Sequence, residues 1–261
     1  MRQRATKEQR QFKVIKDNDL IQKARFQLSE KEQKVILYLI SKIKPRDADF
    51  VHQDFSVAEF CHVCGIYNDS GNNYKNVKEA IKSLADKSTW ITLDSGVEVL
   101  VRWIEKAWVY KNTGTVKIRL DNDIKPYLLQ LRENFTEYEL LYILAMQSRY
   151  SIRLYEILRS YAYKQRVIFD IGELKRKISA ENYTRYPDFK RYVLDISMRE
   201  INDLSDIAVK YEIIKEGRKY SKLEFSIRLK TDHGERLETW ARIDEIIDPP
   251  QLTIFDCEGA T

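Results

Sequence analysis

Residues 187–229 read PDFKRYVLDISMREINDLSDIAVKYEIIKEGRKYSKLEFSIRL, which divides into one helical pattern and two strand patterns. Apolar residues recur at helical spacing over residues 187–204, whereas residues 208–214 and 222–229 are rich in β-branched and aromatic residues. Lys215-Glu216-Gly217-Arg218-Lys219 forms a basic turn between the two strands. A long helix followed by a β-hairpin is the second half of a winged helix, a helix-turn-helix variant whose recognition helix enters the major groove of DNA.

Shorter elements precede this helix and complete the unit. Thr136 is a candidate N-cap, and Glu139 stands three residues later as its capping-box partner. The expected elements are helices at residues 140–146, 152–163 and 171–178 and a short strand at residues 167–169.

The first half of the chain repeats this order. Ser29 and Glu32 form another candidate capping box. Ser56 is the candidate start of a short helix that Gly65 is expected to end. Asn112-Thr113-Gly114 suits a turn between antiparallel strands. The expected elements are helices at residues 29–43, 56–65 and 73–87 and strands at residues 97–109 and 115–120. The sequence therefore predicts an α+β fold of two tandem winged-helix domains related by internal pseudosymmetry.

Charge is distributed unevenly along the chain. Residues 1–16 carry six basic side chains and one acidic, residues 134–231 carry 19 and 14, and residues 232–261 carry two and eight. A clustered basic excess is what phosphate neutralisation needs, although a solvated surface shows a modest excess as well. The expected segments are a basic arm at 1–16, winged-helix domains at 17–128 and 129–231, and an acidic tail at 232–261. We expect the arm to add phosphate contacts through Arg2, Arg4, Lys7 and Arg10.

The long helix presents a polar face opposite its apolar one. Arginine can bind guanine with two hydrogen bonds, asparagine can bind adenine, and aspartate can accept from cytosine. A solvated face with internal ion pairs explains the same spacing equally well. The candidate DNA-binding residues are Lys190, Arg191, Asp195, Arg199 and Asn202 on this helix, with Lys215, Arg218 and Lys219 in the turn.

The helix at 73–87 points Lys75, Lys78 and Lys82 away from its apolar stripe. Lysine is a point charge without a bidentate fork, so these side chains suit phosphate contact better than base recognition. By itself this pattern favours an ordinary surface helix, and DNA contact by the first domain stays open.

Catalytic and metal sites are not predicted. Cys61-His62-Val63-Cys64 is half of a metal-binding pattern, but the rest of the chain adds only His52, His233 and Cys257 as further nitrogen or sulfur ligands. Both cysteines fall on an apolar helix face, so we expect them to pack in the core. No GxxxxGK[ST] segment is present, and the histidines do not supply a nickase metal site. We therefore expect a protein that is not an enzyme, with no metal and no cofactor.

The ends of the chain carry little that indicates export. The start lacks an apolar signal-peptide core, and the longest apolar run, residues 140–146, is too short to cross a bilayer. Three cysteines fit a reducing bacterial cytoplasm. Near the other end, two prolines favour an extended backbone that either inserts into a partner's groove or packs on its own domain. The candidate partner-binding residues are Gln251, Leu252, Ile254 and Phe255.

Several segments at mutually matching distances resemble one known family, the iteron-binding plasmid replication initiators. They span roughly residues 14–230 and are Asn18-Asp19-Leu20, Leu28-Ser29 with residues 32–43, Ile152-Arg153-Leu154-Tyr155-Glu156, Tyr186-Pro187-Asp188-Phe189-Lys190-Arg191 and Glu200-Ile201-Asn202. The resemblance implies two winged helices, of which the second recognises origin repeats and the first contacts DNA or forms a homodimer. It also implies that Arg185, Lys190, Arg191 and the wing residues Gly217-Arg218 occupy basic positions of the family. Tyr192 departs from a position that can be basic, and residues 61–74 match poorly.

The segment at 251–255 resembles the short peptide with which bacterial replication proteins bind the sliding clamp, with Ile254 in place of a leucine. We therefore predict a plasmid replication initiator that binds origin repeats, helps to open the origin and recruits host replication proteins, among them a helicase or host initiator and the clamp. The resemblance also implies a dimer that represses its own gene. The alternative is a winged-helix transcriptional repressor with no role in initiation.

Overall fold

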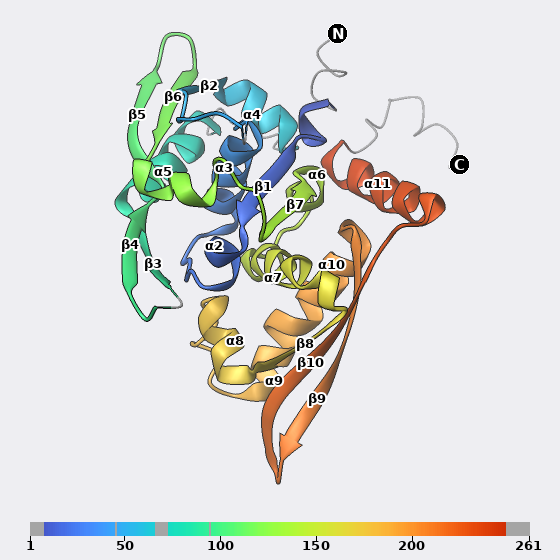
Figure 1. Cartoon of the computed structure of the whole chain (residues 1–261). Coiled ribbons are helices and arrows are strands. Elements are labelled where there is room, and N and C mark those ends of the chain that lie inside the picture. Colours follow the sequence, from blue (N-terminus) through green and yellow to red (C-terminus); the bar gives the residue numbers. More distant parts are fainter. Residues whose placement is uncertain (1–7, 45, 66–72, 94, 249–261) are drawn as a thin grey trace, which may run out of the picture.

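The computed structural model describes residues 8–44, 46–65, 73–93 and 95–248. Figure 1 shows two winged-helix units that meet along a pair of strands. Strand β1 (Lys13–Asp17) runs antiparallel to β7 (Phe135–Glu139), with Ile15 opposite Glu137. Short helices α2 (Asn18–Gln22) and α6 (Leu141–Leu144) follow these strands. The two units are therefore joined through equivalent strands.

The first unit packs three helices against a three-stranded antiparallel sheet of order β2-β6-β5. Its elements are α3 (Glu30–Ser41), β2 (Gln53–Ser56), α4 (Val57–Val63), α5 (Asn73–Asp86), β5 (Ile104–Tyr110) and β6 (Thr115–Leu120). The capping box of Ser29 and Glu32 is confirmed, as are the N-cap of Ser56 and the turn before Thr115, where Gly114 has φ +64°.

The second unit repeats this topology with a sheet of order β8-β10-β9. Its elements are α7 (Arg149–Ser160), β8 (Arg166–Asp170), α8 (Ile171–Lys177), α9 (Tyr186–Phe189), the π turn η3 (Lys190–Leu194), α10 (Asp195–Leu204), β9 (Ile207–Glu216) and β10 (Lys219–Leu229). Short 3-10 turns η1 (Asn122–Tyr127) and η2 (Ala162–Lys164) complete the connections. In both sheets the last strand lies in the middle, so the two units share one plan and the predicted fold is confirmed.

The predicted capping box of Thr136 and Glu139 is wrong. Both residues lie in β7, where the Thr136 hydroxyl is 2.6 Å from the side-chain oxygen of Asn18 and Glu139 accepts a bond from Lys13 at 3.3 Å. Helix α6 begins at Leu141 with no side-chain cap. Pairing with β1 holds these residues extended, and that partner lies about 120 residues away in the sequence.

The first unit has an extra hairpin that the second unit lacks in the described residues. Strands β3 (Ser88–Thr92) and β4 (Glu98–Arg102) form a separate two-stranded sheet. The predicted strand at 97–109 is thus two strands, divided at Trp103, whose ring packs 4.9 Å from that of Phe26. Burying this large side chain turns the chain from one sheet into the other.

The expected acidic tail begins as a helix. Helix α11 (His233–Ile247) buries Thr239, Ile243 and Ile247 against the body, so this part of the tail packs on the protein. The predicted clamp-binding residues lie outside the described residues. None of the helices in the described ranges has the length and apolar character needed to cross a membrane.

Candidate nucleic-acid interface

The predicted recognition helix is continuous from α9 to α10, and it contains a π turn. The amide of Asp195 bonds to the carbonyl of Lys190, five residues earlier. A π turn holds one residue more than an α turn and is frequent at functional sites. Here Val193 and Leu194 are both fully buried, and the two residues before them, Arg191 and Tyr192, are both exposed.

Arginines mark the outer side of this helix. Arg185, Arg191 and Arg199 are all exposed, as the sequence predicts. Arg185 lies 3.9 Å from Asp188, and the Arg191 guanidinium lies 5.3 Å from the ring centre of Tyr192. An exposed guanidinium group can present paired donors to guanine or to phosphate.

Two other predicted residues of the helix form an ion pair. Lys190 Nζ lies 2.8 Å from both carboxylate oxygens of Asp195. This hydrogen bond raises the pKa of Lys190. The ion-pair interpretation of the polar face therefore holds for these two side chains.

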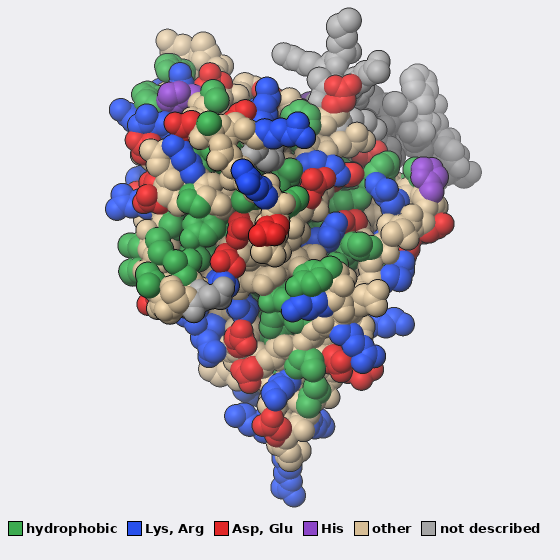
Figure 2. Space-filling model, viewed as in Figure 1, with side chains coloured by type: hydrophobic (Ala, Val, Ile, Leu, Met, Phe, Trp, Pro, Cys, Tyr) green, Lys and Arg blue, Asp and Glu red, His purple; other side chains and the backbone are tan. Residues whose placement is uncertain are grey.

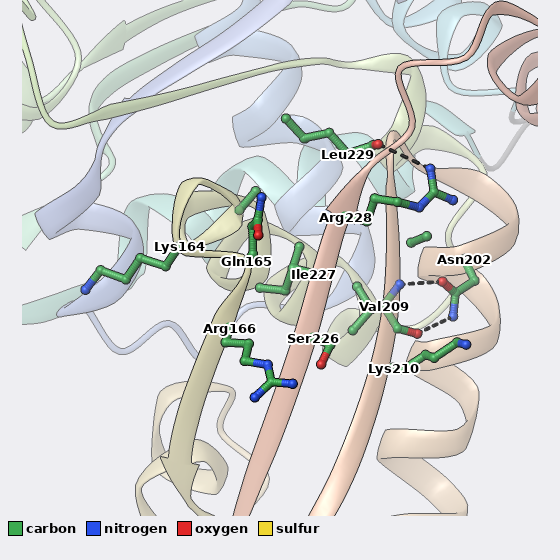
Figure 3. Close-up of a pocket in the computed structure, with 12 residues that line it drawn as sticks. Lys164, Gln165, Arg166, Asn202, Val209, Lys210, Ser226, Ile227, Arg228 and Leu229 are labelled. Atoms are coloured by element: carbon green, nitrogen blue, oxygen red, sulfur yellow. Dashed lines mark hydrogen bonds between the residues drawn. The ribbon is translucent and has the colours of Figure 1, made fainter.

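Asn202 is engaged by the backbone of the wing. Its side-chain amide donates to the Val209 carbonyl at 3.0 Å, and its oxygen accepts from the Val209 N–H at 2.7 Å (Figure 3). The side chain fastens the end of α10 to the start of β9, so its amide is committed here and not presented to an adenine. The helical wheel misses this because the partner belongs to a strand.

The wing extends from the body beside the recognition helix (Figure 1) and ends in a basic tip (Figure 2). Lys215, Arg218 and Lys219 are exposed around Gly217, whose φ of +63° suits the tight turn. Close to the tip, the ring of Tyr220 stacks on that of Tyr186, with centroids 4.3 Å apart. This aromatic pair, which sequence spacing does not reveal, links the wing to the start of the recognition helix.

A groove on the outer face of the wing sheet enlarges the basic surface. It has a volume of about 1000 Å³, and Arg166 and Lys210 lie on either side of Ser226 (Figure 3). Arg166 lies 3.4 Å from Glu224, whereas Arg228 holds Glu235 at 2.6 Å. The basic residues that line the groove are Lys164, Arg166, Lys210 and Arg228. An open groove of this kind suits a phosphate backbone better than a small ligand.

Helix α5 of the first unit matches its predicted wheel. The residues of its apolar stripe are buried, and Lys75, Lys78 and Lys82 are exposed. Lys75 lies 3.9 Å from Glu79, and Lys82 lies 2.7 Å from Asp86. Exposed i,i+4 pairs of this kind are weak and can be exchanged for phosphate contacts.

The predicted phosphate contact by Arg10 is wrong. Its side chain is 1% exposed and donates to the backbone carbonyls of His62 and Val63 and to the carboxylate of Asp248. An arginine with these partners is a structural residue inside the protein. Arg2, Arg4 and Lys7 lie outside the described residues.

Cys61 and Cys64 lie in the core, as predicted. Burial raises the pKa of both thiols. Over the described part of the chain, no group of three or more potential ligands gathers as a metal site.

Comparison with known families identifies the chain. Residues 13–159 match the family model described as Initiator Replication protein, WH1, and residues 170–227 match the one described as Initiator Rep protein, WH2. The chain belongs to the initiator replication protein family. This confirms the resemblance and agrees with the prediction of an initiator that is not an enzyme.

Two relatives agree with this assignment. The PI protein of Escherichia coli is 30% identical to this initiator over an alignment of 152 residues, and the match covers 51% of this chain and 49% of the PI protein. The match thus spans about half the length of that relative. A crystal structure of the Pi initiator protein in complex with iteron DNA superposes with a TM-score of 0.71 over 85% of this chain and 99% of that one. At 22% identity the likeness shows the tandem winged-helix fold.

In this initiator Arg153 and Glu156 of the Arg-Leu-Tyr-Glu segment contact α2, β1 and β7, where the two units meet. Arg153 on α7 donates to the carbonyl of Ile21 in α2 at 2.5 Å and to that of Ala24, just after α2, at 2.8 Å. Burial lowers the pKa of Arg153 to about 10, and the nearby Glu156 opposes this change. Glu156 accepts hydrogen bonds from Lys16 of β1 and from the Tyr138 hydroxyl of β7. The segment therefore holds β1 and α2 against α7.

Proposed function

We propose that this initiator starts replication of a plasmid in the cytoplasm of a bacterial host by binding repeated sequences, or iterons, at the origin. The observation that carries the proposal is the exposed Arg191 and Arg199 on a recognition helix beside a basic wing, in a chain of the initiator family. The Pi initiator protein, which has the same fold, was crystallised with iteron DNA.

In this proposal the second unit recognises bases and the wing contacts phosphates. Arg191 and Arg199 would hold guanines, and Arg185 would bind the backbone before the helix. Lys190 would exchange Asp195 for a phosphate, which frees Asp195 to accept a hydrogen bond from cytosine. Lys215, Arg218 and Lys219 would bind phosphates from the wing.

The test uses duplexes taken from beside the gene. Tight binding to direct repeats supports an initiator, whereas preference for a single inverted repeat supports the alternative, a repressor without a role in initiation. Equal binding to repeats and random duplexes would contradict both.

Phosphate contact by the first unit has its own expected result. Substituting Lys75, Lys78 and Lys82 together with Ala should lower the log–log salt slope of binding by about 0.9 for each phosphate that no longer meets a lysine. The slope is measured by fluorescence anisotropy between low and physiological salt. Lys44→Ala, at an exposed position after α3, is the control and should leave the slope unchanged. An unchanged slope in the triple variant would remove α5 from the interface.

A homodimer that represses its own gene is a further part of the proposal. On the β3–β4 hairpin Trp90 and Leu100 face each other across the strands and are 51% and 45% exposed. Figure 2 shows hydrophobic side chains gathered at the left of the view, where Figure 1 places the β3–β4 hairpin. An apolar pair of this kind favours contact with a second copy of the chain.

Recruitment of the host sliding clamp is proposed for residues 251–255. A peptide of residues 249–258 should bind purified bacterial clamp with a roughly micromolar Kd, because a short extended peptide loses entropy on ordering. The apolar anchors should dominate. The matched control peptide carries Leu252→Ala and Phe255→Ala and should not bind. If both peptides bind equally, or neither binds, recruitment by this segment is excluded.

A further inference from the structure

Helix α11 crosses from the second unit to the first (Figure 1). Near its start Glu235 binds Arg228 of β10 at 2.6 Å. Farther along, Arg242 lies 3.0 Å from Asp203 of α10, and the Trp240 indole donates to the Tyr142 hydroxyl at 3.3 Å. These contacts attach most of the helix to the second unit.

The end of α11 is attached to the first unit. Asp248 accepts two bonds from the Arg10 guanidinium, at 2.6 and 3.2 Å. Ile247 lies against Gly65, where an added Cβ would be 2.6 Å from Ile247 Cγ2 and 2.9 Å from its carbonyl oxygen. Gly65 also has φ +65°, so this approach requires glycine at that position.

Arg10 ties this contact to the helix-turn-helix of the first unit. Its Nε donates to the Val63 carbonyl at 2.9 Å and its Nη2 to the His62 carbonyl at 3.0 Å, at the end of α4. The last carbonyls of a helix lack partners inside it and favour a cation nearby. Helix α5 is the next helix along the chain.

We propose that this contact of Arg10, Gly65, Ile247 and Asp248, called the clasp, is a positioning device for DNA binding. It fixes the first unit relative to the second, so that α5 and the recognition helix engage one duplex together. Two linked binding surfaces with a fixed span gain a high effective concentration, which disappears when their geometry is free. The inference rests on the proposed contact between α5 and DNA.

Asp248→Ala tests the clasp by removing the carboxylate that binds Arg10, at a position that is partly exposed. This variant should show a lower salt slope than the native protein, because α5 no longer reaches the phosphates. Adding the triple lysine substitution of α5 should then change the slope no further, although it lowers the slope in the native background. Arg242→Ala is the matched control, because it removes an ion pair of α11 within the second unit. In that variant the triple substitution should keep its full effect.

Arg10→Lys is a second variant, because an ammonium group cannot serve both carbonyls and both carboxylate oxygens. Hydrogen exchange supplies an independent readout: Asp248→Ala should speed exchange of the α4 and α5 amides, and Arg242→Ala should not. If the triple substitution keeps its effect in Asp248→Ala, the clasp proposal is overturned while the proposed function stands. If the triple substitution has no effect in the native protein, α5 does not contact DNA, and the clasp proposal, which rests on that contact, is overturned.

Discussion

Replacing Glu156 with Gln is expected to lower the free energy of unfolding by about 3–5 kcal/mol, because it leaves a buried ammonium group without its counter-charge. Glu156 Oε1 lies 2.5 Å from Lys16 Nζ and 2.5 Å from the Tyr138 hydroxyl. The side chains of Lys16 and Glu156 are only 2% and 3% exposed. Burial already lowers the pKa of Lys16, and the carboxylate opposes that change.

Urea unfolding measures this effect against a matched substitution. Glu79→Gln makes the same chemical change at an exposed pair on α5, and it should alter the free energy of unfolding by no more than about 0.5 kcal/mol. Adding Lys16→Met to Glu156→Gln should restore part of the stability, because it removes the uncompensated charge. A cost at Glu156 as small as that at Glu79 would show that the network between the units is not needed for stability.

Local patterns in the sequence predict much of this fold. The caps at Ser29 and Ser56 depend on residues within one helical turn, and the buried stripe of α5 follows from a period of 3.6 residues. These features need no knowledge of distant residues.

The errors have a common physical cause, which is a partner in another element that local spacing does not reveal. Thr136 and Glu139 match a capping box, yet β1 takes them into a sheet. Arg10 belongs to a basic segment, yet its carboxylate partner Asp248 is 238 residues away. Asn202 lies on a polar helix face, yet the backbone of the following strand binds its amide. Side-chain type and spacing cannot distinguish a solvent-facing polar group from one with a buried partner.

The segments that carry the family resemblance include buried residues and residues proposed to select the DNA sequence, and the two kinds differ in their surroundings. Arg153 and Glu156 are buried among fixed partners, so a substitution there disturbs the scaffold of the initiator. Arg191 and Tyr192 are exposed, so they can change without loss of the fold. We therefore expect a departure such as Tyr192 to affect which iteron is recognised and to leave the fold intact.

Arg191→Ala is accordingly expected to weaken binding to the cognate repeat by about 1–3 kcal/mol while sparing most of the nonspecific binding. The π turn places Arg191 on the exposed side of the helix. There its guanidinium has donors for guanine O6 and N7. Anisotropy titrations at one fixed salt concentration, on the repeat and on a scrambled duplex, measure both affinities.

Arg132→Ala is the control for removal of one positive charge, because Arg132 is exposed but lies outside α5, the recognition helix and the wing. It should change the two affinities little and by similar factors. A phosphate contact is indifferent to base sequence, so an equal weakening on both duplexes in Arg191→Ala would make Arg191 a backbone contact. A base contact must instead weaken binding to the cognate repeat alone. Arg191→Ala must also reduce discrimination between the correct and the wrong base at one position of the repeat. A set of repeats that each carry one substituted base pair would locate that position.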